Sequence, residues 1–145
     1  MDEIDEKIID AMKKKNLCTP RVSEIAKELG MPTSTVHTRL KNLEKKGIIK
    51  NYVPIIDLEK TGPYIESFVF LKVSPGVYYK EYIERIKKLN FVKDIHILTG
   101  EWAIIVRIRV KNFDNYNNAI QNLTVDKNIM SSQDIISTKC IKKEN

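Results

Sequence analysis

Residues 25–40 have the sequence IAKELGMPTSTVHTRL, which carries the clearest structural signal in the chain. Ala26 lies four residues before Gly30, and Val36 lies six residues after it. A helix-turn-helix needs a small residue where its two helices cross, a glycine at the turn, and an apolar residue that locks the second helix onto the first. All three are present at suitable spacing, so this stretch predicts a helix-turn-helix.

The flanking segments extend this unit. Apolar residues recur at helical spacing over residues 4–12, which predicts a first helix. Thr19, followed by proline, is typical of the start of a second helix, and Gly30 is typical of its end. A third helix is expected over residues 33–46. The β-branched and aromatic residues 48–53 then predict a short strand, or wing.

Charge is distributed unevenly along this first part of the chain. The whole chain of 145 residues has a formal net charge of +6. Residues 1–12 hold five acids and one base, whereas residues 13–50 hold ten bases and three acids. Such a basic block favours a polyanionic partner, here double-stranded DNA. The alternative interpretation is a solvated, lysine-rich surface.

The predicted third helix indicates which side chains would contact DNA. At 100° per residue, its polar face lies opposite Val36, Leu40 and Leu43. Residues near the start of a recognition helix reach base edges, and cations further along contact phosphates. The candidates for base contacts are Ser34, Thr35, His37 and Thr38, with Asn42 beside them. The candidates for phosphate contacts are Arg21, Arg39, Lys41, Lys45 and Lys50.

The remainder of the chain predicts a second domain of the α+β class. Strand and helix patterns alternate in the order β-α-β-β-α-β, which is the ferredoxin-like arrangement. The expected elements are strands over 65–73, 92–98, 103–110 and 129–140, and helices over 79–89 and 113–123. The predicted organisation is a helix-turn-helix domain over 1–53, a linker over 54–63 and the ferredoxin-like domain over 64–145.

The predicted sheet carries helices on one face only, yet two of its strands are apolar at consecutive positions, over 68–71 and 103–106. A strand that is solvated on one face should alternate instead. The open face is therefore expected to be covered by a second copy of the chain, through Phe68, Phe70 and Ile105. A stacking surface for RNA is the alternative, and the aliphatic run at 103–106 argues against it.

Several classes of protein are disfavoured by the composition. No stretch approaches the ~20 apolar residues of a membrane span, and the acidic N-terminus is unlike a secretory signal, so a cytoplasmic protein is expected. Two cysteines and two histidines favour neither a disulfide framework nor a metal site, and no cofactor is expected. An enzyme would need converging polar groups, but the candidates Glu66, Asp94, His96 and Glu101 form no recognisable pair.

Five motifs, in order, resemble the Lrp/AsnC or feast/famine family of transcriptional regulators. They are DEIDEKII at 2–9, IAKELGM at 25–31, STVHTRLKNLEKKGII at 34–49, PIID at 54–57 and TGEW at 99–102. The resemblance spans nearly the whole chain. It implies a sequence-specific DNA-binding regulator that acts as a dimer and assembles further, often into octamers. The alternative is an architectural protein that binds DNA with little sequence preference.

The resemblance also implies a response to a small effector. Many members bind an amino acid through the C-terminal domain, at a junction between dimers. By position, the candidates here are Thr99, Gly100, Glu101 and Trp102, with Ser131 and Ser132 on the last strand. Members usually carry an aspartate directly after the aromatic residue of the turn, where this chain has Ala103. Glu101 as a substitute, a different effector, and no effector are all compatible with this departure.

Overall fold

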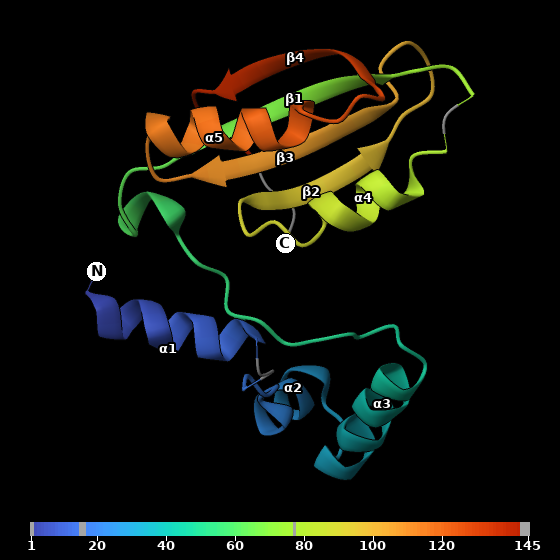
Figure 1. Ribbon diagram of the computed structural model, residues 1–145. Helices are drawn as coiled ribbons and strands as arrows, with labels where there is room; N and C mark the ends of the chain where they lie inside the picture. Colours follow the sequence, from blue (N-terminus) through green and yellow to red (C-terminus); the bar gives the residue numbers. More distant parts are fainter. Residues whose placement is uncertain (1, 15–16, 77, 143–145) are drawn as a thin grey trace. The chain divides into compact units, whose positions relative to one another are not determined.

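The computed structural model describes residues 2–14, 17–76 and 78–142. The contacts divide the chain into two compact units, Met1–Thr61 and Gly62–Asn145 (Figure 1). Among the helices of the described residues, none is both long and apolar enough to cross a lipid bilayer.

The first unit contains the three predicted helices, α1 (Glu3–Lys14), α2 (Val22–Leu29) and α3 (Thr33–Lys45). Asp2 and Asp5 cap the start of α1 reciprocally, since each carboxylate accepts the backbone N–H of the other. The predicted start of α2 is wrong by two residues. Arg21 occupies the N-cap position, so Thr19 lies two residues before the cap.

The helix-turn-helix corner forms as predicted. Ala26 and Val36 are each 4% exposed and are the buried hydrophobic residues of α2 and α3. Gly30 caps α2 in the left-handed conformation, with φ at 61°. The Met31 N–H then donates to the Ala26 carbonyl at 3.0 Å, which satisfies an end of the helix and turns the chain toward α3.

The predicted strand over residues 48–53 is not formed, and the described residues of the first unit contain no strand. The reason lies in the hydrogen bonds. The N–H groups of Ile48 and Ile49 both donate to the Leu43 carbonyl, so the start of the segment caps α3. Residues 51–53 are assigned to no helix or strand, and among the described residues of this unit there is no strand with which they could pair. A 3-10 turn, η1 (Leu58–Lys60), follows.

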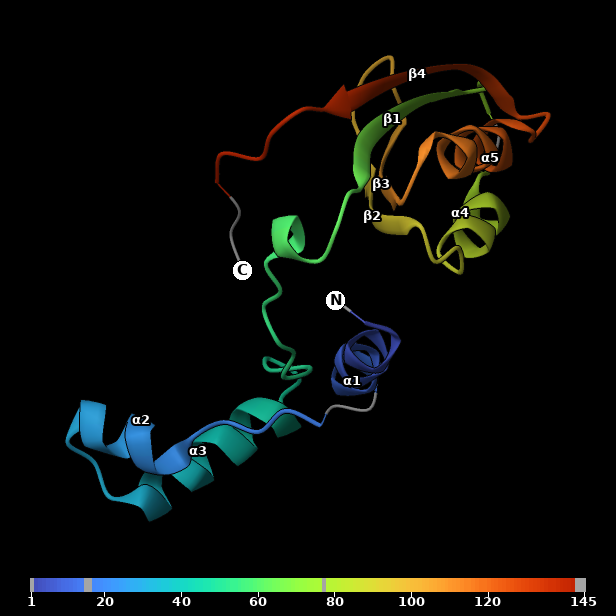
Figure 2. The ribbon, with the colours of Figure 1, turned by 90° about the vertical axis from the view of Figure 1, so that its left-hand side faces the viewer.

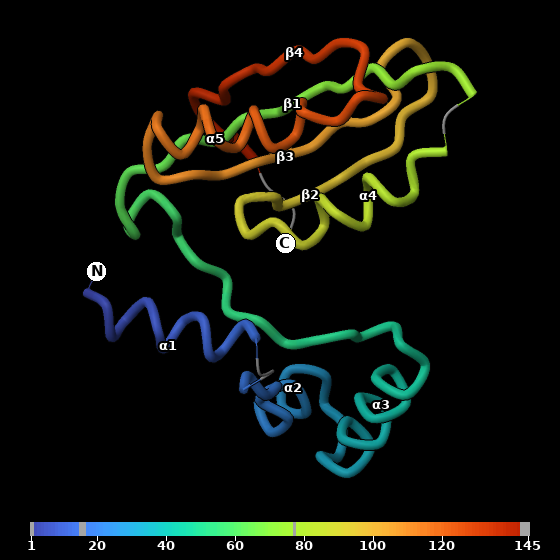
Figure 3. Tube along the Cα trace, in the orientation of Figure 1, coloured from blue at the N-terminus to red at the C-terminus, as the bar shows by residue number. Residues whose placement is uncertain are grey.

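The second unit has the predicted order: β1 (Ile65–Val73), α4 (Lys80–Ile86), β2 (Val92–Ile97), β3 (Ile104–Val110), α5 (Phe113–Thr124) and β4 (Ile129–Ser137). The strands form one antiparallel sheet in the order β2-β3-β1-β4, which the trace in Figure 3 follows. Figure 2 shows α4 and α5 on the same face of this sheet. The last strand ends three residues earlier than predicted.

The core of the second unit lies between the sheet and its two helices. Val69, Leu71, Ile104, Val106 and Ile108 are fully buried on this face, against Ile86 of α4 and Leu123 of α5. The intervening residues of β1 and β3 point to the opposite face, since side chains alternate along a strand. We call this second surface, which carries no helix of its own, the open face.

Candidate functional site

The polar face of α3 is exposed along its length. The predicted base-contacting residues Ser34, Thr35, His37 and Thr38 are all exposed, as is Asn42, while Val36 between them is buried against α2. Their exposure follows from the corner, because packing Val36 and Ala26 together turns the rest of α3 outward. Contact with bases stays a prediction for each of them.

The hydroxyl of Thr38 already has a partner. Its Oγ1 donates to the Ser34 carbonyl at 2.9 Å, within the same helix. The donor of this hydroxyl is therefore used, and only its acceptor lone pairs and its methyl group remain for another molecule. A base edge facing Thr38 would have to offer an N–H group or an apolar methyl.

The predicted phosphate-contacting residues are exposed as well, and two of them have carboxylate partners. Arg21 Nη1 lies 3.0 Å from Glu24 Oε1, and Lys41 Nζ lies 3.5 Å from Glu44 Oε2. Exposed ion pairs of this kind contribute only about 0–1 kcal/mol. Both cations can therefore exchange these partners for a phosphate at low cost. Arg39, Lys45 and Lys50 are also exposed.

A hollow of about 470 Å³ lies beside α3, between this helix, the loop before α2 and residues 49–52. Its lining includes His37, Lys41 and Lys50. The Tyr52 hydroxyl donates to Glu44 Oε1 at 3.0 Å and so holds the extended segment against the helix. The pKa of Tyr52 is raised, mainly by partial burial and to a smaller extent by this hydrogen bond. Thr19 and Asn51 also line the hollow, and neither was predicted from the sequence as a residue of the site.

The three predicted dimer residues lie together on the open face. Phe70 on β1 is directly opposite Ile105 on β3, and Phe68 lies two residues before Phe70 on the same face of β1. Ile135 on β4 is paired with Phe68 and is 49% exposed. These four side chains, which we call the apolar patch, form one continuous surface across three strands. Their contact with a second copy stays a prediction.

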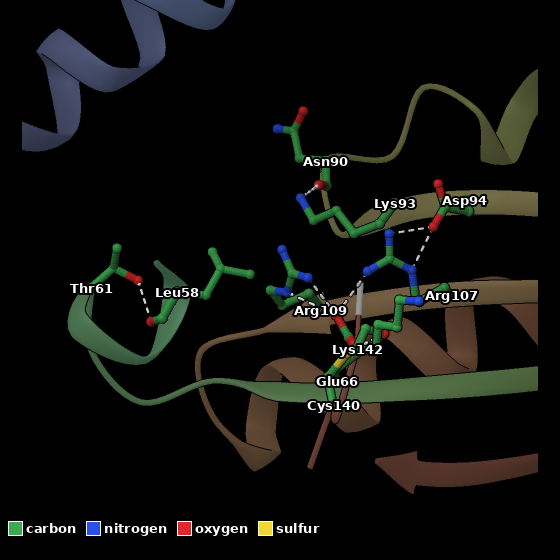
Figure 4. Close-up of polar contacts among 10 residues, drawn as sticks. All are labelled: Leu58, Thr61, Glu66, Asn90, Lys93, Asp94, Arg107, Arg109, Cys140 and Lys142. Atoms are coloured by element: carbon green, nitrogen blue, oxygen red, sulfur yellow. Dashed lines mark hydrogen bonds and ion pairs between the residues drawn. The ribbon is translucent and has the colours of Figure 1, made fainter. Parts of the chain in front are cut away.

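Figure 4 shows an ion network on the sheet. It lies beside the apolar patch, because Arg107 on β3 is paired with Phe68 on β1. Glu66 Oε2 accepts from Arg107 Nη1 at 3.0 Å and from Arg109 Nε at 3.0 Å. Arg107 also pairs with Asp94 of β2. The Glu66, Arg107 and Arg109 side chains are only 11%, 18% and 17% exposed. No sequence pattern predicted this network, although both arginines alternate with buried residues along β3.

The hairpin between β2 and β3 carries the predicted effector turn. Gly100 has a φ of 113°, and Leu98 N–H closes the hairpin onto the Ala103 carbonyl at 2.8 Å. Lys72 Nζ lies 2.7 Å from Glu101 Oε1, and this hydrogen bond, with the ammonium charge, lowers the pKa of Glu101. The rings of Trp102 and Phe70 meet edge to face with their centroids 6.2 Å apart. Trp102 thus joins this turn to the apolar patch.

The two predicted serines on β4 lie on opposite faces of the sheet. Ser131 is paired with Lys72, which faces the open side, whereas Ser132 is paired with the buried Leu71. The structure therefore places Ser131 on the same face as the Lys72–Glu101 pair, but it does not bring Ser132 there. Thr99 and Gly100 are exposed at the tip of the hairpin. The described residues contain no group of three His, Cys, Asp or Glu side chains arranged to hold a metal ion.

Two family models match the chain, one for each unit. Residues 1–50 match a model described as winged helix-turn-helix DNA-binding, and residues 66–145 match a model described as the Lrp/AsnC ligand binding domain. The chain is also 30% identical to the HTH-type transcriptional regulator FL11 of Pyrococcus furiosus. That match covers 99% of this chain and 93% of FL11.

Solved structures share the fold. AsnC of E. coli has a TM-score of 0.77 at 18% identity, covering 100% of this chain and 97% of that one. A feast or famine regulatory protein from M. tuberculosis, complexed with L-methionine, has a TM-score of 0.75 at 21% identity. It covers 99% of this chain and 95% of that one. At these identities the likeness establishes the α+β fold of both units.

Proposed function

Because this chain belongs to the Lrp/AsnC family of DNA-binding transcriptional regulators, we propose that the exposed face of α3 reads its operator sequence. The observation that carries this proposal is the buried Ala26–Val36 corner, which leaves the polar face of α3 free for a groove. Ser34, Thr35, His37, Thr38 and Asn42 supply the base contacts. Arg21, Arg39, Lys41, Lys45 and Lys50 supply the phosphate contacts.

The proposed dimer forms through the apolar patch. The patch is continuous over β3, β1 and β4. The ion network beside it has two guanidinium groups and two carboxylates, so its charges cancel within one chain. When a second sheet covers such a network, no unpaired charge is removed from water. Two copies then present two α3 helices to two half-sites, and their affinities compound.

We assign effector binding to the Lys72–Glu101 pair and its surroundings. A zwitterionic amino acid can exchange with this exposed pair, its carboxylate meeting Lys72 and its ammonium meeting Glu101. Glu101 then supplies the carboxylate that the family usually places at position 103, and Thr99, Gly100 and Ser131 border the bound molecule. Trp102 and Phe70 offer an apolar surface to its side chain. That a structurally similar M. tuberculosis protein is complexed with L-methionine supports an amino acid as the class of ligand.

Selection of bound DNA from a random pool tests the proposal as a whole. The pool is incubated with the full-length protein, with and without a mixture of amino acids, and the bound fraction is sequenced. We expect enrichment of a two-fold symmetric sequence whose half-sites lie about ten base pairs apart or a multiple of that. Enrichment should change when amino acids are present. A pool that stays random after repeated rounds would indicate an architectural protein instead.

A further inference from the structure

Strand β2 stands at one end of the strand order in the sheet that the described residues form. Figure 1 shows α4 beside this edge strand. A groove of about 510 Å³ lies between the two elements, and its lining comprises Ile83, Lys87 and residues 92–97. A sheet edge next to a groove is the arrangement in which an extended peptide can add a strand to a sheet.

The hydrogen bonds between β2 and β3 indicate which backbone groups of β2 face outward. The Leu98 N–H donates to the Ala103 carbonyl at 2.8 Å, so Leu98 directs its backbone toward β3. In an antiparallel pair, successive residues direct their backbone groups alternately toward the partner strand and away from it. The N–H and C=O groups of Ile95 and Ile97 therefore point away from β3, where an added strand can bond to them.

The side chains of the same two residues lie on the helix-bearing face of the sheet. Ile95 is paired with Val106 and Ile97 with Ile104, and both partners are buried in the core. Ile104 is fully buried, whereas Ile97 is 61% exposed in the groove. Every second side chain of an added strand would lie on this face, against Ile97 and the partly buried Ile83.

The charges of the groove favour an acidic partner. Lys87 and Lys93 are exposed in its lining. The carboxylate of the lining, Asp94, is paired with Arg107. Lys87 Nζ lies 3.0 Å from Glu84 Oε1, and such an exposed pair can exchange for another carboxylate at low cost. A second copy of β2 would bring the same lysines to the edge, so charge repulsion opposes pairing of β2 with itself.

We propose that the β2 edge and its groove form a docking surface for an extended, acidic segment of another protein, which adds a fifth strand to the sheet. The backbone of this segment bonds to Ile95 and Ile97, and its apolar side chains pack against Ile97 and Ile83. Its carboxylates lie beside Lys87 and Lys93. The surface is separate from the open face and from α3, so the inference is independent of the proposed dimer and of the DNA contacts. A chain bound to DNA thereby holds a second protein near its operator.

Selection from random dodecapeptides displayed on phage tests the docking surface. The full chain is the bait, and phage that also bind Ile97→Asp, which places a carboxylate in the groove, are removed. Ile141→Asp is the matched control, because Ile141 is 85% exposed and lies beyond the last strand. We expect acidic peptides with apolar residues at alternate positions, which bind Ile97→Asp about tenfold or more weakly than Ile141→Asp and the original chain. No enrichment, or enriched peptides without acidic residues, would overturn the proposal.

Amide hydrogen exchange measured by NMR identifies the backbone contact. In the chain alone, the N–H groups of Ile95 and Ile97 should exchange faster than that of His96, because only His96 bonds to β3. A selected peptide should slow exchange at Ile95 and Ile97 by about tenfold or more. Of two copies of this peptide, N-methylated at odd or at even residues, one should lose binding and the other keep it, since every second N–H faces β2. Slow exchange at both residues in the chain alone would show that the edge is already covered, and unchanged exchange with bound peptide would place the peptide elsewhere; either result overturns the proposal.

Charge reversal tests the preference for an acidic segment. Lys93→Glu should weaken binding of the selected peptide by about tenfold. Lys80→Glu makes the same change at an exposed residue of α4 outside the groove and should leave binding unchanged. A peptide with lysine in place of its acidic residues should bind Lys93→Glu better than it binds the original chain. Equal binding of the acidic peptide by Lys93→Glu and Lys80→Glu would show that its carboxylates do not lie beside Lys93.

Discussion

At the scale of single residues, Thr38 gives the sharpest test of base recognition. Its hydroxyl donates to the Ser34 carbonyl, so in the proposed complex this hydroxyl meets a base edge only as an acceptor. Thr38→Val removes this acceptor and keeps the shape of the side chain. We expect discrimination at one base pair of each half-site to fall by about 1–3 kcal/mol. Selection and sequencing with the variant measures this, and an unchanged preference at every position would contradict the assignment.

Lys45 should behave differently, because a phosphate contact carries no sequence information. Lys45→Gln removes the charge from an exposed side chain of α3. We expect weaker binding to all sequences alike, with the slope of log K against log salt lower by about 1 for each α3 helix engaged. Titrations of operator and random DNA at several salt concentrations test this. A loss confined to one operator would identify Lys45 as a base-reading residue.

Effector binding should depend on pH through Glu101. The hydrogen bond from Lys72 lowers its pKa in the folded chain, so the ion pair is present above this lowered pKa and is lost as the pH falls through it. Isothermal titration with single amino acids should therefore show binding at neutral pH that weakens under acid conditions. Glu101→Gln should reduce neutral-pH affinity by about tenfold or more and remove the acid dependence. Equal affinity of the variant and the original chain would exclude Glu101 as the ammonium partner.

At the scale of elements, Gly30 controls the turn between α2 and α3. It adopts a φ of 61°, and a Cβ built there would meet no atom within 4 Å. The cost of Gly30→Ala is therefore backbone strain alone, about 1–2 kcal/mol of unfolding free energy. Urea unfolding followed by circular dichroism measures it. Gly30→Asn is the matched control and should lose less, because asparagine tolerates the left-handed region. Equal losses in the two variants would mean that strain is not the cause.

The elements also show what sequence patterns can and cannot predict. The strands and helices of the second unit were predicted to within a few residues, because apolar spacing is strong there and Gly or Pro marks several ends. The strand predicted over 48–53 was wrong. A strand needs a partner strand, and the first N–H groups of this segment instead cap α3. Helix capping by Arg21 in place of Thr19 was likewise beyond the pattern.

Candidate site residues were harder to predict than elements. The polar face of α3 follows from helical geometry once Val36 is known to be buried. The ion network around Glu66 cannot be predicted in this way. It joins residues from three strands, and the register between these strands is not evident from the sequence. Strand register is also what separates Ser131 from Ser132, since neighbouring residues on a strand point to opposite faces.

At the scale of the whole molecule, the open face of the second unit carries the proposed dimer contact. The open face carries apolar side chains and an internally neutral ion network, which suits a permanent, largely desolvated contact. An effector bound near Glu101 needs only to favour one arrangement of dimers to change which half-sites are occupied together.

Phe70→Asp tests the permanent contact. Phe70 belongs to the apolar patch, where it lies opposite Ile105 and contacts the Trp102 ring. A carboxylate there remains partly solvated in a single chain, but it would be buried without a partner in the dimer. We expect a folded monomer, detected by sedimentation equilibrium and circular dichroism, with operator affinity reduced at least 100-fold because the two half-sites are no longer linked. Tyr78→Asp, which makes the same kind of change at an exposed residue outside the sheet, should remain a dimer. A Phe70→Asp chain that still sediments as a dimer would place the contact elsewhere on the molecule.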